Sequence, residues 1–269
     1  MAIMCRMAGY SGPTLHLHDL VDRPPHSLHA QSYAAKELET SVVAADGWGA
    51  AWYLTDDPEP CVYRSTLPIW GDVNRGDLGR TVASRLLLAA VRSATDPVSI
   101  APLNTQPFSF GSLSFVHNGY VAGFRQALRR RVCERLSDEL YGNVAGDTDS
   151  EHLFALIADR WQSASELPPA ERLLLAVRQG VGELRTLARQ VSTQALLTLL
   201  ISDGESLVAA RGAENARSPS LYAKHSKTAG QTWFASEPLD ADASSWVPVA
   251  DETLWIAHRN GTLERHDLT

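Results

Sequence analysis

The chain has 269 residues, of which 44% are hydrophobic and 20% are charged, so it can bury a sizeable core. Its net charge of −7 argues against a nucleic-acid binder, because such a protein normally carries a basic face. No apolar run approaches the ~20 residues that span a bilayer, and no basic segment precedes an apolar core at the N-terminus. We therefore expect a cytoplasmic protein with neither a nucleic-acid nor a membrane partner.

Short β-like runs dominate the first half of the sequence. Each run is rich in apolar or aromatic residues and is bounded by Gly, Pro or Asp, which is typical of strands. The polar stretches Asp56–Pro60 and Asp72–Asp77 are expected to form loops. Strands are predicted at Met7–Tyr10, Gly49–Leu54, Cys61–Arg64, Leu86–Val91 and Leu113–Val116.

The middle of the sequence has helical periodicity. The basic run Arg129–Arg131 lies among apolar residues at every fourth position, so we interpret it as the solvated face of a helix. Asp149-Ser150 is expected to cap a second helix, whose apolar residues recur at helical spacing as far as Trp161. Pro168-Pro169 then opens a longer helix from about Ala170 to Gln190.

Strands return in the last third of the chain. Asn260-Gly261 lies between the last two of them and is a strong hairpin signal. The order of strands, helices and strands predicts an α+β fold in which layered sheets are flanked by helices. We find no repeat and no linker, and expect a single domain over residues 5–269. The predicted strands are Ala195–Ser202, Leu207–Arg211, Trp233–Ala235, Leu254–Ala257 and Thr262–Glu264.

The three cysteines are Cys5, Cys61 and Cys133, and this small odd number speaks against a disulfide framework. None of them belongs to a C-x-x-C pair, so we expect neither a zinc cage nor a dithiol redox site. Cys61 and Cys133 are interpreted as ordinary packing residues.

Cys5 lies directly behind a second methionine, Met4. If translation starts at Met4, removal of that methionine leaves Cys5 first in the chain with a free α-amine. That amine, with a pKa of about 8, can take the thiol proton and produce the nucleophilic thiolate. If Met1 is the start, Cys5 is an internal thiol unless a short propeptide is cleaved. We favour Met4, because methionine excision before a small residue needs no special protease, and expect residues 1–4 to be absent or removed in the active form.

A thiolate that attacks a carbonyl needs hydrogen-bond donors for the developing oxyanion. The stretch FVHNG ends a predicted strand and offers two of them, the side-chain amide of Asn118 and the backbone N–H of Gly119. A substrate with amino-acid character also needs a cation for its carboxylate and an anion for its ammonium group. Arg92, Thr95 and Asp149 suit these tasks, although spacing alone does not bring them together.

Five motifs occur in an order that resembles the glutaminase domain of class II glutamine amidotransferases, which are N-terminal-nucleophile hydrolases. Each motif is weak alone, and their order carries the resemblance. It implies the four-layer αββα sandwich of these hydrolases. The motifs are Cys5 behind a methionine, Arg92–Thr95 (RSAT), Asn104–Phe108 (NTQPF), His117–Gly119 (HNG) and Thr148–Glu151 (TDSE).

Further stretches are similar to one stand-alone branch of this family, the γ-glutamyl hydrolases of ergothioneine biosynthesis. The similarity runs from Cys5 to about Asp251 and leaves no room for a synthase domain. The branch implies hydrolysis of γ-glutamyl-hercynylcysteine S-oxide to glutamate and hercynylcysteine S-oxide, without a cofactor or a metal. The stretches are Pro24–Ser32 (PPHSLHAQS), Ala45–Tyr53 (ADGWGAAWY), Tyr63–Asp72 (YRSTLPIWGD), Val91–Ile100 (VRSATDPVSI) and Ala235–Asp240 (ASEPLD).

The family implies that Cys5 is the nucleophile, with its own α-amine as the base, and that it forms a γ-glutamyl thioester. The side chain of Asn118 and the backbone N–H of Gly119 would form the oxyanion hole. Read locally, Asn118-Gly119 is also a tight turn, and a turn can present both donors. Many members of the family carry histidine where this chain has Gln106, so a role of that histidine does not transfer to this sequence.

The resemblance also implies that Arg92 and Thr95 hold the α-carboxylate of the γ-glutamyl group and that Asp149 holds its α-ammonium. The substrate of the branch carries a trimethylammonium group, which aromatic faces attract by ~0.5–2 kcal/mol. We hypothesise that Trp48 or Trp70 contacts this betaine group, although core packing is the commoner role of a single tryptophan.

Other interpretations stay open at this point. A glutaminase subunit that supplies ammonia to a separate synthase, or a hydrolase of another γ-glutamyl conjugate, would carry the same motifs, and so would a non-catalytic binding protein of this fold. The stretch Leu15–Asp19 (LHLHD) matches the start of the metal pattern H-x-H-x-D, but Leu20 takes the place of the next histidine, so we do not expect a metal. The oligomeric state is not evident from the sequence.

Overall fold

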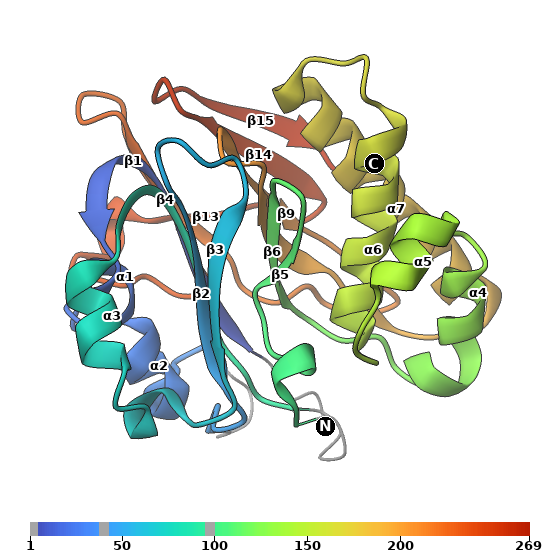
Figure 1. Cartoon of the computed structure of the whole chain (residues 1–269), viewed down its shortest axis with the longest axis horizontal. Coiled ribbons are helices and arrows are strands. Elements are labelled where there is room, and N and C mark those ends of the chain that lie inside the picture. Colours follow the sequence, from blue (N-terminus) through green and yellow to red (C-terminus); the bar gives the residue numbers. More distant parts are fainter. Residues whose placement is uncertain (1–4, 38–42, 95–99) are drawn as a thin grey trace.

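The computed structural model describes residues 5–37, 43–94 and 100–269, which form two sheets packed face to face with helices on both outer faces (Figure 1). The helices α1 (His18–Val21), α2 (Leu28–Ala34) and α3 (Arg75–Thr81) cover one sheet. The long helices α6 (Asp149–Ser163) and α7 (Pro169–Gln190) cover the other. This arrangement confirms the α+β fold and the four-layer αββα sandwich expected from the sequence.

The larger sheet has seven strands among the described residues, in the order β13-β11-β12-β1-β4-β2-β3, and all of its pairs are antiparallel. β1 lies at its centre, so the chain enters the middle of this sheet directly after Cys5. The strands are β1 (Arg6–His16), β2 (Trp48–Tyr53), β3 (Pro60–Ser65), β4 (Ala83–Val91), β11 (Tyr222–Ser226), β12 (Gln231–Ala235) and β13 (Val247–Pro248).

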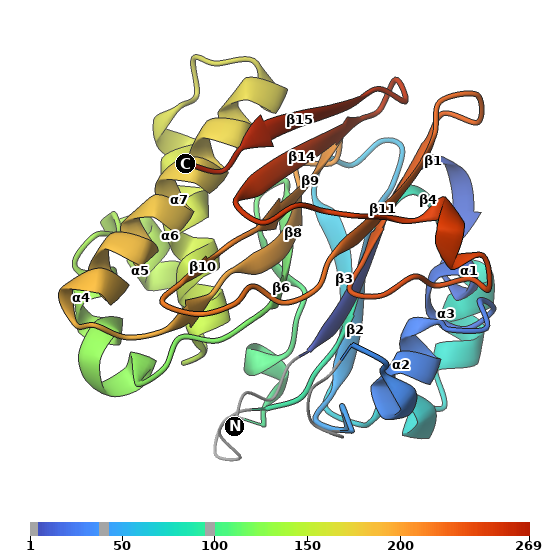
Figure 2. The same ribbon diagram turned by 180° about the vertical axis from the view of Figure 1, so that it is seen from behind.

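The second sheet has six strands in the described part of the chain, in the order β15-β14-β9-β8-β6-β5 (Figure 2). The predicted strand Ala195–Ser202 divides between this sheet and the short β10-β7 pair. Asn260-Gly261 joins β14 to β15 as expected, with Gly261 at φ 83°. The strands are β5 (Phe108–Phe110), β6 (Leu113–Asn118), β7 (Ala195–Leu196), β8 (Thr198–Ser202), β9 (Ser206–Arg211), β10 (Ala213–Glu214), β14 (Thr253–His258) and β15 (Leu263–Asp267).

Side chains along the central strands alternate between two buried layers. In β1, Met7 packs between the sheets, whereas Ala8 packs against the helices α1 and α2. In β4, Leu88 packs between the sheets, whereas Leu87 packs against the helix-covered side. Because both faces of these strands are covered, their sequences are almost continuously apolar. The same alternation directs Cys5 between the sheets and Arg6 toward the helices.

Two expectations for the helices need correction. Thr148 caps α6, since its side chain accepts a hydrogen bond from the Glu151 N–H, whereas Asp149 is already the first helical residue. The stretch Asp72–Asp77 is not entirely a loop, because α3 begins at Arg75. The apolar stripe beside the arginine run is buried at Phe124, Leu128 and Val132, as predicted, but its first turn is a π-helix (Phe124–Leu128), followed by α4 (Arg129–Cys133).

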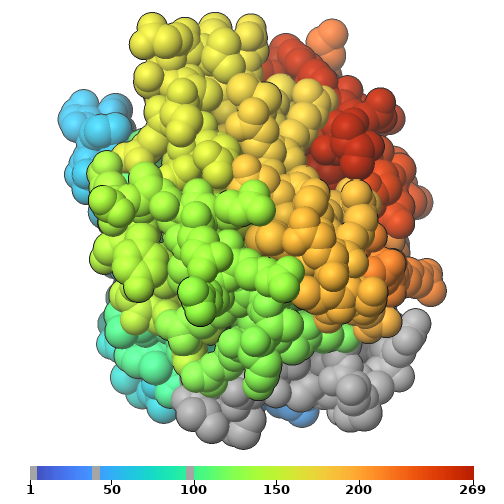
Figure 3. Space-filling model, turned by 90° about the vertical axis from the view of Figure 1, so that its right-hand side faces the viewer, coloured from blue at the N-terminus to red at the C-terminus, as the bar shows by residue number. Residues whose placement is uncertain are grey.

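The helices α6 and α7 pack against each other and, with α4 and α5 (Asp138–Asn143), form much of the surface on this side of the molecule (Figure 3). Residues of α6 and α7 share one core cluster with β6, β8 and β9. None of the helices in the described ranges is both long and apolar enough to cross a membrane.

The two tryptophans singled out in the sequence occupy different environments. Trp48 is fully buried, its Nε1 donates a 2.9 Å hydrogen bond to Asp72 Oδ2, and its ring lies 5.4 Å from that of Tyr63. Trp70 is 42% exposed, and the edge of its ring packs against Tyr33. Trp48 is therefore a core residue of the helix-covered side of the larger sheet.

Replacing Trp48 by alanine is expected to lower the free energy of unfolding by about 3–5 kcal/mol, because it leaves a cavity and removes one of the hydrogen-bond donors to the buried Asp72 carboxylate. The matched change Trp70→Ala is expected to cost less than about 1.5 kcal/mol. Urea denaturation of both variants measures the difference. Equal losses would contradict these placements.

Candidate active site

Of the residues predicted to act in catalysis or substrate binding, Cys5, Arg92, Gly119 and Asp149 line one cavity of about 490 Å³, and Asn118 does not. Cys5 precedes β1 and Arg92 follows β4, so both come from the larger sheet. Gly119 follows β6 of the second sheet, and Asp149 opens α6. The ends of strands from two different sheets therefore meet at this cavity. A larger cavity of about 710 Å³ lies at the opposite ends of the same strands and contains none of these residues.

The Cys5 thiol is only 7% exposed and lies 3.9 Å from the carbonyl oxygen of Ser93. Burial raises the pKa of this thiol, and the positive charge of Arg92 partly opposes the effect. Close to neutral pH the thiol is therefore protonated, and it needs a base beside it before it can act as a nucleophile.

The turn that carries Arg92 is held by the segment before β2. The Asp46 N–H donates to the Arg92 carbonyl at 3.0 Å, and the Arg92 N–H donates to the Gly47 carbonyl at 2.8 Å. Asp46 Oδ2 also accepts from the Ala94 N–H at 2.8 Å. Arg92 therefore lines the cavity on a backbone segment whose N–H and carbonyl groups are both hydrogen-bonded.

Asn118 is the last residue of β6 and Gly119 follows it without the tight turn expected from the sequence, and the two residues differ in exposure. Asn118 is fully buried, and its Nδ2 donates to Ser236 Oγ at 3.5 Å. Its Oδ1 has no hydrogen-bond partner among the described residues. A Cβ on Gly119 would lie 2.0 Å from the Leu196 carbonyl oxygen and 2.5 Å from His117 Nε2, so only glycine fits there.

His117 is a neutral structural residue in this arrangement. Its Nε2 lies 2.9 Å from the Leu196 carbonyl oxygen, which can only accept, so Nε2 carries the proton. Its Nδ1 then accepts from Ser150 Oγ at 2.9 Å. Burial lowers the pKa of His117, which agrees with a neutral ring.

Gln106 pairs with the backbone of β6 in the manner of a neighbouring strand. Its Nε2 donates to the His117 carbonyl at 3.0 Å, and its Oε1 accepts from the His117 N–H. The side chain therefore supports the residue that precedes Asn118. This contact gives a structural role to the glutamine that departs from the family pattern.

Asp149 ties the loop after β6 to the first turn of α6. Its Oδ2 accepts from the Val121 N–H at 2.6 Å and its Oδ1 from the Ser150 N–H at 2.8 Å. Each carboxylate oxygen has a second lone pair, so Asp149 can also accept from a ligand in the cavity that it lines.

The wall of the cavity carries charges of both signs. Besides Arg92 and Asp149 it includes Arg125 and Asp147, whose Nη2 and Oδ2 atoms are 2.8 Å apart. Asn104 Nδ2 donates to the other oxygen of Asp147 at 2.9 Å. A cavity with two cations and two anions suits a zwitterionic ligand such as a group with a free amino-acid end.

Other residues named from the sequence do not join this cavity. Thr95 lies outside the described residues, so its expected role has no structural counterpart here. Neither Trp48 nor Trp70 lines the cavity, so their predicted contact with a betaine group receives no support from this arrangement. Cys61 and Cys133 are half-buried free thiols. Within the described ranges, no group of three His, Cys, Asp or Glu side chains is placed to hold a metal.

Sequence reasoning missed several residues that hold the site together, namely Asp46, Ser93, Ser150 and Ser236. Asp46, Ser93 and Ser236 fall within stretches that resemble the family (ADGWGAAWY, VRSATDPVSI and ASEPLD), and Ser150 falls within TDSE. The resemblance was the available signal. The resemblance identified these stretches of sequence but did not indicate which atoms the four residues contact.

Comparison with known proteins places these observations in a family. The sequence pattern described as class-II glutamine amidotransferases matches residues 26–227. The γ-glutamyl-hercynylcysteine sulfoxide hydrolase of Mycolicibacterium smegmatis is 33% identical over 251 residues, which cover 93% of this chain and 94% of that protein. The probable glutamine amidotransferase DUG3 of Saccharomyces cerevisiae is 28% identical over 77% of this chain, which spans 63% of the length of that relative.

Among solved structures, the glutamine aminotransferase class-II domain protein from Silicibacter pomeroyi superimposes with a TM-score of 0.68 at 26% identity. The match covers 98% of this chain and 99% of that one. The similarity therefore includes both sheets and both helical layers.

Replacing Gly119 by alanine is expected to destabilise the protein by about 1–3 kcal/mol or more, because the added methyl group collides with backbone at Leu196. The matched control is Gly142→Ala in α5, where an added Cβ meets no atom within 4 Å. That change is expected to be neutral or slightly stabilising. Thermal unfolding of the two variants measures this, and an unaffected Gly119→Ala variant would show that the backbone at Gly119 does not lie as close to Leu196 as described.

Proposed function

This chain belongs to the class II glutamine amidotransferases and is an amide hydrolase, and we propose that its substrate is γ-glutamyl-hercynylcysteine S-oxide. Hydrolysis of the γ-glutamyl amide bond would release glutamate and hercynylcysteine S-oxide, as in ergothioneine biosynthesis. The observation that carries the proposal is the single cavity in which the Cys5 thiol, the Gly119 backbone and charges of both signs come together. The choice of substrate rests on the similarity to the M. smegmatis hydrolase, which extends over nearly the whole of both chains.

In the proposed mechanism Cys5 is the first residue of the active chain, with residues 1–4 absent or removed. Its α-amine takes the thiol proton, and the thiolate attacks the δ-carbonyl carbon of the glutamyl group. The oxyanion accepts hydrogen bonds from Asn118 Nδ2 and from the Gly119 N–H. The C–N bond then breaks, and the leaving amine takes the proton back from the α-ammonium group.

The product of this first half is a γ-glutamyl thioester on Cys5. A water molecule gives a proton to the α-amine and attacks the thioester carbonyl, and the same two donors stabilise the second oxyanion. The C–S bond breaks, glutamate leaves, and the thiol is restored. Burial of Cys5 is consistent with this scheme, because a thiol with a raised pKa depends on the adjacent amine.

Recognition of the glutamyl group is assigned to the charged walls of the cavity. Arg92, together with Thr95, would bind the α-carboxylate, and Asp149 would accept from the α-ammonium group. Hydrogen bonds hold the backbone of Arg92 and the carboxylate of Asp149, so the Asp149 carboxylate and the segment that carries Arg92 are in place before the substrate binds.

The alternative is a glutaminase subunit that supplies ammonia to a separate synthase, or a hydrolase of another γ-glutamyl conjugate. The similarity to the yeast protein named a probable glutamine amidotransferase keeps these possibilities in view. All of them share the same cysteine chemistry and differ in the amine that leaves.

Protein expressed from Met4, with Cys5 confirmed as its first residue by intact mass, is expected to release glutamate rapidly from γ-glutamyl-hercynylcysteine S-oxide and slowly from glutamine. Cys5→Ala is expected to abolish release, whereas the control Cys61→Ala keeps it, because Cys61 lies in β3 away from the cavity. Preference for glutamine would instead indicate an ammonia-supplying subunit. Full activity of Cys5→Ala would contradict the proposed chemistry as a whole.

A further inference from the structure

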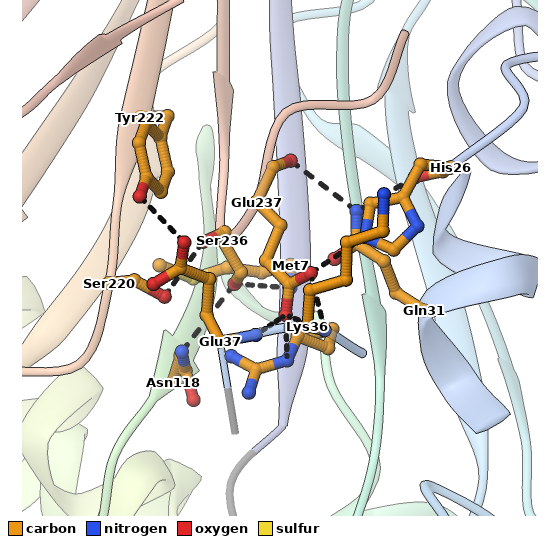
Figure 4. A network of polar contacts seen from close by, with 11 residues as sticks. Met7, His26, Gln31, Lys36, Glu37, Asn118, Ser220, Tyr222, Ser236 and Glu237 are labelled. Carbon is orange, nitrogen blue, oxygen red and sulfur yellow. Dashed lines mark hydrogen bonds and ion pairs between the residues drawn. The ribbon is translucent and has the colours of Figure 1, made fainter. Parts of the chain in front are cut away.

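Two family-like stretches of sequence, Pro24–Ser32 and Ala235–Asp240, meet around Glu237, next to the start of β1. The carboxylate of Glu237 accepts from His26 Nε2 at 2.6 Å and from the N–H groups of Lys36 and Glu37 at 2.9 and 3.0 Å. Arg6, directly after Cys5, places its Nε 3.5 Å from the same carboxylate. Figure 4 shows how Glu237 joins the segment around α2 to the end of β12. The larger sheet is thus anchored on its helix-covered face at the strand that begins with Arg6.

Ser236, the residue before Glu237, bonds twice to β1. Its N–H donates to the Met7 carbonyl at 2.9 Å, and its Oγ accepts from the Met7 N–H at 3.0 Å. Ser220 Oγ donates to the Ser236 carbonyl at 2.9 Å. The two bonds to Met7, which follows Cys5 by two residues, are the contacts that fix the hydroxyl of Ser236, and Ser236 is fully buried.

The same hydroxyl reaches the second sheet. Asn118 Nδ2 donates to Ser236 Oγ at 3.5 Å, and the two side chains face each other across the space between the sheets (Figure 4). This contact connects the strand of Cys5 with the residue proposed as the oxyanion donor. It is long for a hydrogen bond, and such bonds at catalytic groups often shorten when the substrate engages.

The orientation of the Asn118 amide depends on this contact. A side-chain amide has almost the same shape when its oxygen and nitrogen exchange places, so hydrogen bonds decide which atom points where. Asn118 Oδ1 has no hydrogen-bond partner among the described residues, so the bond to Ser236 Oγ holds the amide in place. The Ser236 hydroxyl can donate as well as accept, so it fixes the position of the amide, and the developing oxyanion, which only accepts, selects the orientation that turns an N–H toward it. A reversed amide would present a carbonyl oxygen to the developing oxyanion and would repel it.

We propose that Ser236 is a positioning residue of the reaction: its hydroxyl, fixed on β1 by Met7, orients the Asn118 amide so that a second N–H faces the oxyanion. This inference rests on the proposed function, because it requires Asn118 to be an oxyanion donor. Glu237 also holds β1, on its helix-covered face, through the ion pair with Arg6. The role of the ASEPLD stretch is then to align the two halves of the catalytic centre, which belong to different sheets.

The test is a double-mutant cycle on glutamate release with Ser236→Ala and Asn118→Ala, in protein that begins at Cys5. Asn118→Ala is expected to lower kcat by about 100-fold or more, as loss of an oxyanion donor does elsewhere. Ser236→Ala is expected to lower kcat by about 10-fold with little change in KM, since a misoriented amide affects the transition state more than substrate binding. In the Asn118→Ala background, Ser236→Ala is expected to cause no further fall, because there is no amide left to orient.

Ser220→Ala is the matched control. It removes a hydroxyl that bonds to the same residue, Ser236, without touching Asn118, and is expected to leave kcat within about 2-fold of the wild type. Should Ser236→Ala fail to fold because the Met7 N–H loses its acceptor, Ser236→Cys keeps a group of similar shape that accepts only weakly. It is expected to lower kcat by several-fold, and again only when Asn118 is present.

The possible outcomes distinguish failure of the positioning role of Ser236 from failure of the proposed function. If Ser236→Ala lowers kcat by the same factor in the Asn118→Ala background as in the wild type, or changes KM alone, the positioning role is overturned and the proposed function stays intact. A loss in Ser220→Ala as large as that in Ser236→Ala would overturn it as well. Wild-type kcat in Asn118→Ala would instead contradict the proposed oxyanion hole, and the role of Ser236 would fall with it.

Discussion

The proposed catalytic centre is divided between two sheets that share no strand, so its geometry depends on the apolar packing between them. Cys5 begins the central strand of one sheet and Asn118 ends a strand of the other. Between the sheets, a Cβ on Gly9 would approach side-chain atoms of Leu200 and Leu207 to 3.0 and 3.2 Å, so the missing side chain lets β1 lie close to the opposite sheet. Because protein interiors are closely packed, the two sheets have little freedom to shift relative to each other. The separation of the thiol from its donors is therefore set by residues that never touch the substrate.

Much of the fold could be predicted from the sequence because both faces of its central strands are buried. The run Leu86–Val91 lies within β4, and the predicted helix Ala170–Gln190 differs from α7 by one residue at its start. The strand β11 (Tyr222–Ser226) was missed, since its side chains are mostly half-exposed and include Lys and His. The short helices α1 to α3 were missed too, because helices of four to seven residues owe their stability to packing on the sheet rather than to their own periodicity.

The site was only partly accessible to sequence reasoning. The residues Cys5, Arg92, Gly119 and Asp149 were found through ordered motifs, but their spacing could not place them in one cavity, which required the topology of both sheets. The role of Ser236 could not be predicted for the same reason, since its contact with Met7 joins residues 229 positions apart. For Trp48, the pattern could not distinguish a ligand-binding ring from a core ring, because that distinction depends on Asp72 and on which face of β2 the helices cover.

In the proposed mechanism a thioester forms on a cysteine that begins the chain. It is tested most directly by quenching the enzyme with acid during turnover of its γ-glutamyl substrate and locating the adduct by peptide mass spectrometry. We expect a glutamyl group on Cys5, in a peptide whose first residue is Cys5, and no such adduct after Asn118→Ala under the same brief incubation. An adduct on Cys61 or Cys133, or an active chain that keeps the residues before Cys5, would contradict it.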